Sequence, residues 1–193
     1  MKTKIAQLIR MISLPAILAL LLLSLLANQQ PAAFSGPDFF ISTVWIVVLP
    51  LLAYPLSFIS EQKGMDSREK QRSLAFGLTM AGHTIALLYG IIKGTSAELR
   101  VIYWTYFLSI LFLFAFNKLL RIRASAHAAS VAGTLVLILL LLGSKWILPC
   151  IILAIAVAWA SLCLKRHSIQ ELLLGAVCGI GSYAVSTWIV FSI

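Results

Sequence analysis

Apolar residues fill seven long runs of the chain, and short polar segments separate them. The runs lie at about residues 11–27, 40–59, 74–92, 101–116, 125–142, 146–164 and 168–190. Each approaches the roughly 20 apolar residues that a helix needs to cross the hydrocarbon core of a bilayer. The pattern predicts an all-α fold, a polytopic transmembrane helix bundle of about six to seven spans. Residues 1–193 are expected to form a single integral membrane domain.

Two kinds of residue inside the runs bear on helix shape. Pro50 and Pro55 in the second run lack a backbone N–H and predict a kink there. Gly175 and Gly179 in the last run have the GxxxG spacing, which predicts that another helix approaches closely. The first run follows a basic segment but ends without a small-x-small cleavage site. We therefore expect it to remain as the first span.

The composition agrees with a membrane protein and changes how the charge is interpreted. Hydrophobic residues make up 61% of the chain, against roughly 45–50% in soluble domains. The net charge of +9 would suggest nucleic acid in a soluble protein. Here the basic residues lie in short connections, so we expect the lipid bilayer or an anionic substrate, and no nucleic acid, as partner. Three cysteines in apolar runs show no metal-ligand spacing, and no cofactor or metal is expected.

The basic residues gather on one side of the predicted bundle. With seven spans, the amino terminus and the connections at 60–73, 117–124 and 165–167 share a side, which carries 12 of the 15 Lys and Arg residues. The positive-inside rule would place this side in the cytoplasm. A phosphate-binding mouth at the same place would explain the charge equally well. The three residues on the other side are Lys93, Arg100 and Lys145.

Histidine, serine and carboxylate side chains stand beside two of these connections. His167 and Glu171 are four residues apart, so they share a helix face. The carboxylate can hold one imidazole nitrogen protonated and leave the other as a nucleophile or base, although a surface pair is the simpler alternative. His127 follows Ser125 at the start of the fifth run, where free backbone N–H groups favour an anion. The Ser125 hydroxyl is expected to cap this helix or to contact a phosphate oxygen.

Two segments around these histidines carry a resemblance. One reads Ala124-Ser125-Ala126-His127, and the other reads Ala160-Ser161, five residues, His167, three residues, Glu171. With the basic segment 63–72 they resemble the three motifs of the type 2 phosphatidic acid phosphatase superfamily, membrane lipid phosphatases related to vanadium haloperoxidases. The family pattern is a Lys/Arg-rich segment, then Pro-Ser-Gly-His, then Ser-Arg, five residues, His, three residues, Asp.

The resemblance implies hydrolysis of a lipid phosphate or isoprenyl diphosphate without a metal. His167 would attack phosphorus and form a phosphohistidine, Glu171 would orient it, and His127 would protonate the leaving oxygen. Water would then release phosphate. The residues expected to bind the phosphoryl group are Ser125, Arg68, Arg72, Lys118, Arg121, Arg123 and Arg166.

The chain also departs from the family pattern. Ser161 stands where the pattern has arginine, Ala124 and Ala126 replace its proline and glycine, and Glu171 replaces its aspartate. A lost guanidinium removes transition-state stabilisation unless a neighbouring basic side chain replaces it. The alternative is a catalytically inactive protein with the family's fold.

A further alternative is a small lipid-binding or transport membrane protein. In that case the prolines and His83 in the third run would mark a pathway; a hydrogen-bonded packing role for His83 is the other interpretation. An enzyme requires His127 and His167 to face one pocket, and a carrier does not. The resemblance implies a bacterial cell (inner) membrane with the site on its outer face, opposite to the side given by the charge bias.

Overall fold

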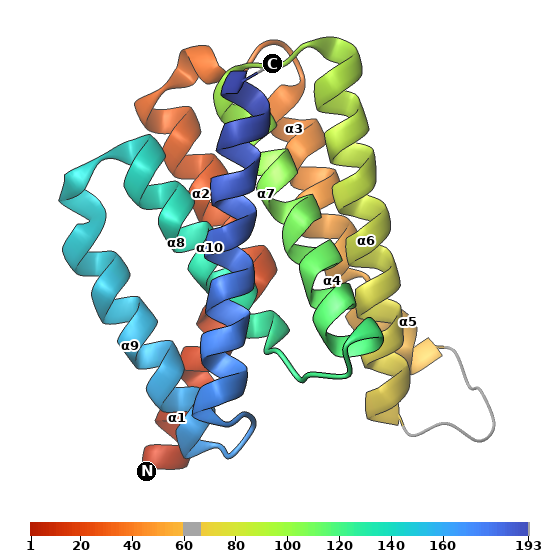
Figure 1. Ribbon diagram of the computed structural model, residues 1–193, viewed down its shortest axis with the longest axis vertical. Coiled ribbons are helices and arrows are strands. Elements are labelled where there is room, and N and C mark those ends of the chain that lie inside the picture. The colour runs from red at the N-terminus through yellow and green to blue at the C-terminus, as the bar shows by residue number, and fades with distance from the viewer. Residues whose placement is uncertain (60–66, 193) are drawn as a thin grey trace.

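The computed structural model describes residues 1–59 and 67–192, with the backbone alone for residues 58–59 and 67–70 (Figure 1). Every regular element in this part of the chain is helical. The α-helices are α1 (Lys2–Ile12), α2 (Pro15–Gln29), α3 (Asp38–Thr43), α4 (Leu49–Leu51), α5 (Ala53–Ile59), α6 (Ser67–Lys93), α7 (Ala97–Phe114), α8 (Ala126–Leu142), α9 (Ile147–Cys163) and α10 (Ile169–Ser192). Two π-helical segments, η2 (Val44–Val48) and η3 (Ala115–Leu119), and two short 3-10 turns, η1 (Pro31–Ala33) and η4 (Ser144–Trp146), complete them.

Five segments in the described residues are long and apolar enough to cross a membrane, and the bent pair α1 and α2 makes up to six. Helix α8 is apolar but shorter, at 17 residues. The predicted all-α membrane bundle is confirmed, and the chain is an integral membrane protein. All seven predicted runs are helical, but only five to six meet the length for a span. The five are Asp38–Ser57, Gln71–Lys93, Ala97–Leu119, Ser144–Cys163 and Ile169–Ser192.

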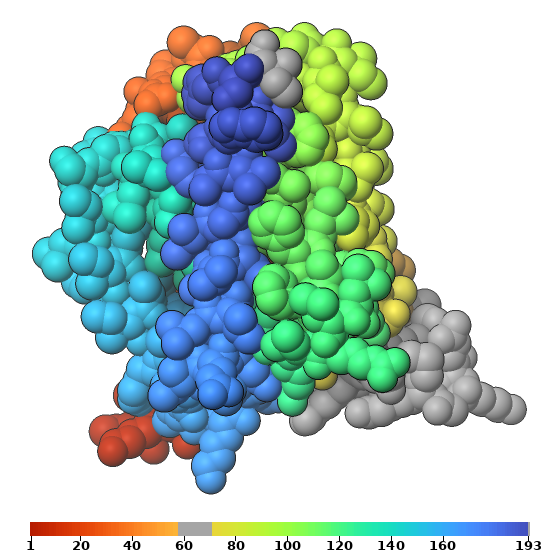
Figure 2. All heavy atoms as spheres, viewed as in Figure 1, coloured from red at the N-terminus to blue at the C-terminus, as the bar shows by residue number. Residues whose placement is uncertain are grey.

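Much of the apolar surface faces outward, as a lipid-exposed bundle requires. The large exposed side chains on α9 and α10 include Leu148, Ile155, Trp188 and Phe191. Figure 2 shows α10 lying between α7 and α9 on this face. The buried core instead involves α2, α7 and α8, where Leu22, Ile102 and Leu137 are fully buried.

The first predicted span is bent, which the sequence analysis did not anticipate. The chain bends by 52° between α1 and α2. Pro15 begins α2, and the residue before it, Leu14, is extended (φ −54°, ψ 138°) because the proline ring disfavours a helical conformation there. The apolar run continues across this break, so hydropathy alone does not reveal it. The bend places Ser13, which is fully buried, at the junction of the two helices.

The second span is interrupted near its prolines. The π-helical η2 precedes Pro50, and a break at Leu52 separates α4 from α5, which contains Pro55. Proline removes a hydrogen bond from the helical ladder, and such local changes accommodate the loss. The irregularity predicted from the prolines is present, although Asp38–Ser57 still qualifies as one span.

The predicted glycine contact is confirmed between α8 and α10. A Cβ atom added to Gly175 would collide with the Ser125 carbonyl oxygen, and one added to Gly179 would collide with the Ala129 carbonyl oxygen. Only glycine allows the two backbones to approach this closely. The contact therefore holds the first turn of α8 directly against the first turns of α10.

The two ends of the bundle differ in composition. Figure 1 places the amino terminus, the end of α5, the start of α6, the α7–α8 connection and the α9–α10 connection together at one end. The α2–α3, α6–α7 and α8–α9 connections lie at the other end with the end of α10. The predicted gathering of the basic connections on one side is present for the described residues; segment 60–66 lies outside them. We call the first end the basic end.

Candidate functional site

The predicted contact between His167 and Glu171 is present at the basic end. His167 lies in the connection between α9 and α10, and Glu171 lies in the first turn of α10. The His167 Nδ1 atom is 2.7 Å from Glu171 Oε2, and the two side chains are 15% and 16% exposed. A proton on Nδ1 that is donated to the carboxylate leaves the Nε2 lone pair free. This is the arrangement that a nucleophilic imidazole needs.

The start of α8 is fixed to this pair through the backbone. The Ser125 N–H donates to the Glu171 carbonyl oxygen at 2.9 Å. The buried Ser125 hydroxyl accepts from the Ala128 N–H at 3.3 Å and caps α8. The predicted cap is confirmed, while a phosphate contact by Ser125 remains a prediction. Gly175, one turn beyond Glu171, allows this approach.

His127 lies in the first turn of α8 and is held from the other side by the α1–α2 junction. Its Nε2 atom is 3.1 Å from the hydroxyl of Ser13. Because the start of α8 is tied to the first turn of α10 through Ser125 and Glu171, His127 lies at the same end of the bundle as the α9–α10 connection that carries His167.

Arg10 supplies a guanidinium that the sequence analysis did not place at the site. Its Nη1 atom donates to the Ser161 hydroxyl at 2.8 Å, and Ser161 is fully buried in the last turns of α9. Ser161 occupies the position where the resembled family pattern has arginine. Arg10 contacts Ser161, and Ser13, one helical turn further along, contacts His127. A single segment at the end of α1 therefore contacts both residues. The only sequence signal was a basic residue at the edge of an apolar run, which is typical of any membrane-flanking residue.

The loop that leads into α8 is held by a side-chain amide. Asn117 donates to the carbonyl oxygens of Leu113 and Ala124, at 3.0 and 3.2 Å, and its Oδ1 accepts from the Ala124 N–H at 2.9 Å. This clamp positions Arg123, whose Nε atom is 3.5 Å from Glu171 Oε1. Glu171 therefore has two cationic partners when His167 is protonated.

The remaining predicted phosphate-binding residues are less closely tied to the histidines. Those with described side chains are all exposed, and no ion pair involves them within the described part of the chain. The side chain of Arg68 lies outside the described residues. Arg121 adopts a left-handed backbone conformation with φ 58°. The exposed residues of this set are Arg72, Lys118, Arg121 and Arg166.

An apolar cavity of about 110 Å³ adjoins the His127 side of this cluster. It lies between the start of α2, the broken second span and α6. Its lining includes Leu14, the chain neighbour of Ser13. The lining residues are Leu14, Pro15, Ala16, Pro50, Leu51, Tyr54, Ala75 and Thr79.

His83 has a packing role in the structure. It is 8% exposed, and its Nδ1 atom is 3.1 Å from the Tyr106 carbonyl oxygen. The Tyr106 hydroxyl is in turn 2.8 Å from the Thr134 hydroxyl. These contacts join α6, α7 and α8. They agree with a packing role for His83 and not with a place on a transport pathway.

A second polar cluster, absent from the sequence analysis, lies at the opposite end. Asp38 is 1% exposed and accepts from the Ser35 N–H and hydroxyl, at 2.8 and 3.0 Å. It also accepts from the Tyr89 hydroxyl at 2.6 Å and pairs with Lys93 at 3.3 Å. With four donors on one carboxylate, the charge of Asp38 is satisfied, and the cluster joins α3 to α6.

Comparison of the chain with protein-family models, curated proteins and solved structures finds no match. The case for a function therefore depends on the site itself. That site combines an imidazole held by a carboxylate, a second imidazole, and a guanidinium on a buried serine at the basic end of a membrane bundle.

Proposed function

We propose that the chain is a metal-independent membrane phosphatase that hydrolyses a lipid phosphate or an isoprenyl diphosphate through a phosphohistidine. The observation that supports this proposal is that the His167–Glu171 pair, His127 and Arg10 lie together at the basic end. A nucleophile held by an acid, a second proton carrier and fixed cations are what phosphoryl transfer requires without a metal. The bacterial inner membrane is part of this proposal.

In the proposed first step the His167 Nε2 atom attacks phosphorus, and the bond between phosphorus and the leaving oxygen breaks. His127 gives its proton to that oxygen, which leaves as an alcohol or a monophosphate. Glu171 stabilises the positive charge that develops on His167. Arg10 and Arg123 neutralise the non-bridging oxygens. The hydrogen bond from Arg10 to Ser161 holds the Arg10 guanidinium beside Ser161, the position at which the resembled family pattern has arginine.

In the second step water attacks the phosphohistidine. His127 accepts a proton from the water, the P–N bond breaks, and inorganic phosphate leaves with His167 restored. The cavity beside Ser13 suits the first methylenes of a lipid tail, because its lining is mostly apolar.

The test is phosphate release by the detergent-purified chain in EDTA from phosphatidic acid, phosphatidylglycerol phosphate and farnesyl diphosphate. We expect His167→Ala to abolish release and His127→Ala to lower it about 10²- to 10⁴-fold, the usual contribution of a general acid. Lys145→Gln, an exposed residue of the opposite end, is the matched control and should retain activity.

Trapping the intermediate gives an independent check. A labelled substrate should leave an acid-labile, alkali-stable adduct that is absent in His167→Ala. Release that persists in His167→Ala would rule out this mechanism. Release from none of the substrates would favour the inactive protein, and retention of lipid without turnover would favour the lipid-binding or transport alternative.

A further inference from the structure

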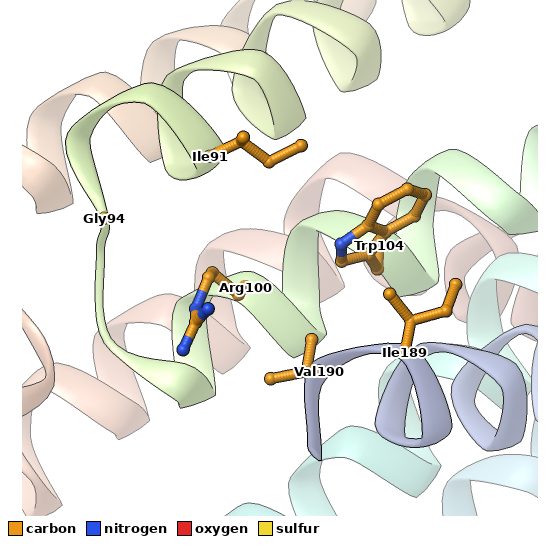
Figure 3. Close-up of a pocket in the computed structure, with 6 residues that line it drawn as sticks. All are labelled: Ile91, Gly94, Arg100, Trp104, Ile189 and Val190. Atoms are coloured by element: carbon orange, nitrogen blue, oxygen red, sulfur yellow. The ribbon is translucent and has the colours of Figure 1, made fainter. Parts of the chain in front are cut away.

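The cavity at the opposite end of the bundle is larger than the one beside the histidines. It measures about 370 Å³ and lies between the end of α6, the start of α7 and the end of α10. Figure 3 shows Arg100 and Trp104 of α7 facing the same space as Ile91 of α6 and Ile189 of α10. Gly94 and Val190 complete the lining.

Arg100 lines this cavity, and one of its own buried hydrogen-bond donors has no partner among the described residues. Its Nε atom is shielded from solvent and has no hydrogen-bond partner in the described part of the chain. No described carboxylate forms an ion pair with it, whereas the nearby Lys93 pairs with Asp38 at 3.3 Å. A buried donor of a charged group that has no hydrogen-bond partner is costly. Arg100 lines the cavity, so an anion there would pair with the guanidinium charge that no described carboxylate neutralises.

The walls around Arg100 indicate what kind of anion fits. Ile91 is 52% exposed on the outer surface of α6, so the cavity is continuous with the lipid-facing side of the bundle. Arginine and tryptophan are the residues that meet lipid head groups at the ends of membrane spans. A free phosphate ion would contact only Arg100 and leave the apolar walls uncovered. A lipid would cover both the charged and the apolar parts of the lining, with its head group on the guanidinium and its chain along the isoleucines.

We propose that this cavity binds the anionic head group of a membrane phospholipid in the leaflet opposite the histidines. The proposal does not depend on the phosphatase function, because none of its residues belongs to the histidine cluster. Arg100 provides the charge, and Trp104 and the isoleucines hold the glycerol and upper acyl region. A zwitterionic lipid is disfavoured because the described lining offers no carboxylate to its ammonium group.

The test uses Trp104 as a reporter in the full-length, detergent-purified chain. Its fluorescence is obtained as the difference between the wild type and Trp104→Phe. We expect brominated phosphatidylglycerol to quench this signal at a lower mole fraction than brominated phosphatidylcholine, because the choline cation of the latter would lie beside the Arg100 guanidinium without a carboxylate in the described lining to pair with it. Arg100→Gln should remove the preference, and Lys145→Gln, at the same end, should retain it. Inorganic phosphate at millimolar concentration should not compete.

Equal quenching by the two lipids in the wild type would overturn the proposal without any variant. Competition by inorganic phosphate would also overturn it, in favour of a free-anion site. Arg100→Lys guards against a folding defect in Arg100→Gln, because it keeps the charge and should keep most of the preference. A preference that is unchanged in Arg100→Gln would likewise refute the assigned role of the guanidinium.

Discussion

Gly179 offers a quantitative test of the contact that joins α8 to α10. A methyl group at this position would meet the Ala129 carbonyl oxygen and would approach Gly133 N at 2.7 Å. Both are backbone atoms, so neither can rotate away, and the helices must separate. Overpacking of this kind costs about 1–3 kcal/mol. Alanine also gains up to about 1 kcal/mol of helix propensity over glycine, which offsets part of that cost.

Gly181 on the same helix is the matched control. Its added methyl group would have only Phe112 Cε2 as a neighbour, at 3.9 Å, an ordinary van der Waals distance. Because both substitutions gain the same helix propensity, their difference isolates the contact and should be about 1–3 kcal/mol. For a chain of this size that is a difference in Tm of about 2–12 °C.

The assay is thermal unfolding of the two variants in one detergent, followed by circular dichroism or intrinsic fluorescence. We expect Gly181→Ala to melt at or above the wild-type temperature and Gly179→Ala to melt below it. Equal Tm values for the two variants would refute the proposed backbone contact. If the start of α8 also moves, Gly179→Ala should lose the proposed phosphatase activity at temperatures where it is still folded, because Ser125 and Glu171 are tied across the same interface.

Three further predictions concern single side chains. Arg10→Gln should lower phosphate release about 10²- to 10³-fold, as removal of one transition-state donor does, whereas Lys4→Gln on the same helix should not; equal rates would exclude Arg10 from the site. Ser125→Ala should lower the free energy of unfolding by about 1 kcal/mol through loss of the α8 cap, measured as a Tm decrease, and an unchanged Tm would contradict the cap. Asp38→Ala should destabilise the chain by about 1–3 kcal/mol because it leaves the partly buried Tyr89 hydroxyl without its acceptor, with Tyr89→Phe in the same background restoring part of the loss in a thermal melt.

Hydropathy and helix periodicity were sufficient for the fold class, because lipid-exposed helices must carry their apolar residues in continuous runs. They were also sufficient for the His167–Glu171 contact and the Ser125 cap, since both depend on residues three or four positions apart. The glycine contact followed from the spacing of Gly175 and Gly179. Each of these predictions depends on a sequence pattern that lies within one helix or at its end.

The parts that sequence analysis missed depend on contacts between distant segments. Arg10 and Ser161 are 151 residues apart, and no periodic pattern links them. The bend at Ser13 is hidden because a proline in the first turn of a helix is compatible with a straight or a bent entry. Asp38 stood in a polar turn as an isolated carboxylate, and only the folded chain shows that Tyr89 and Lys93 reach it from α6.

The contact between Arg10 and Ser161 joins α1 to α9, and this has a consequence for biogenesis. During synthesis the guanidinium enters the membrane boundary long before its serine partner exists. At roughly 5–20 residues per second, the delay is on the order of ten to thirty seconds. Throughout that interval α1 has no partner on α9, and its most favourable position is at the lipid surface with its basic face in water. The histidine cluster can therefore be completed only after α9 and α10 have been synthesised.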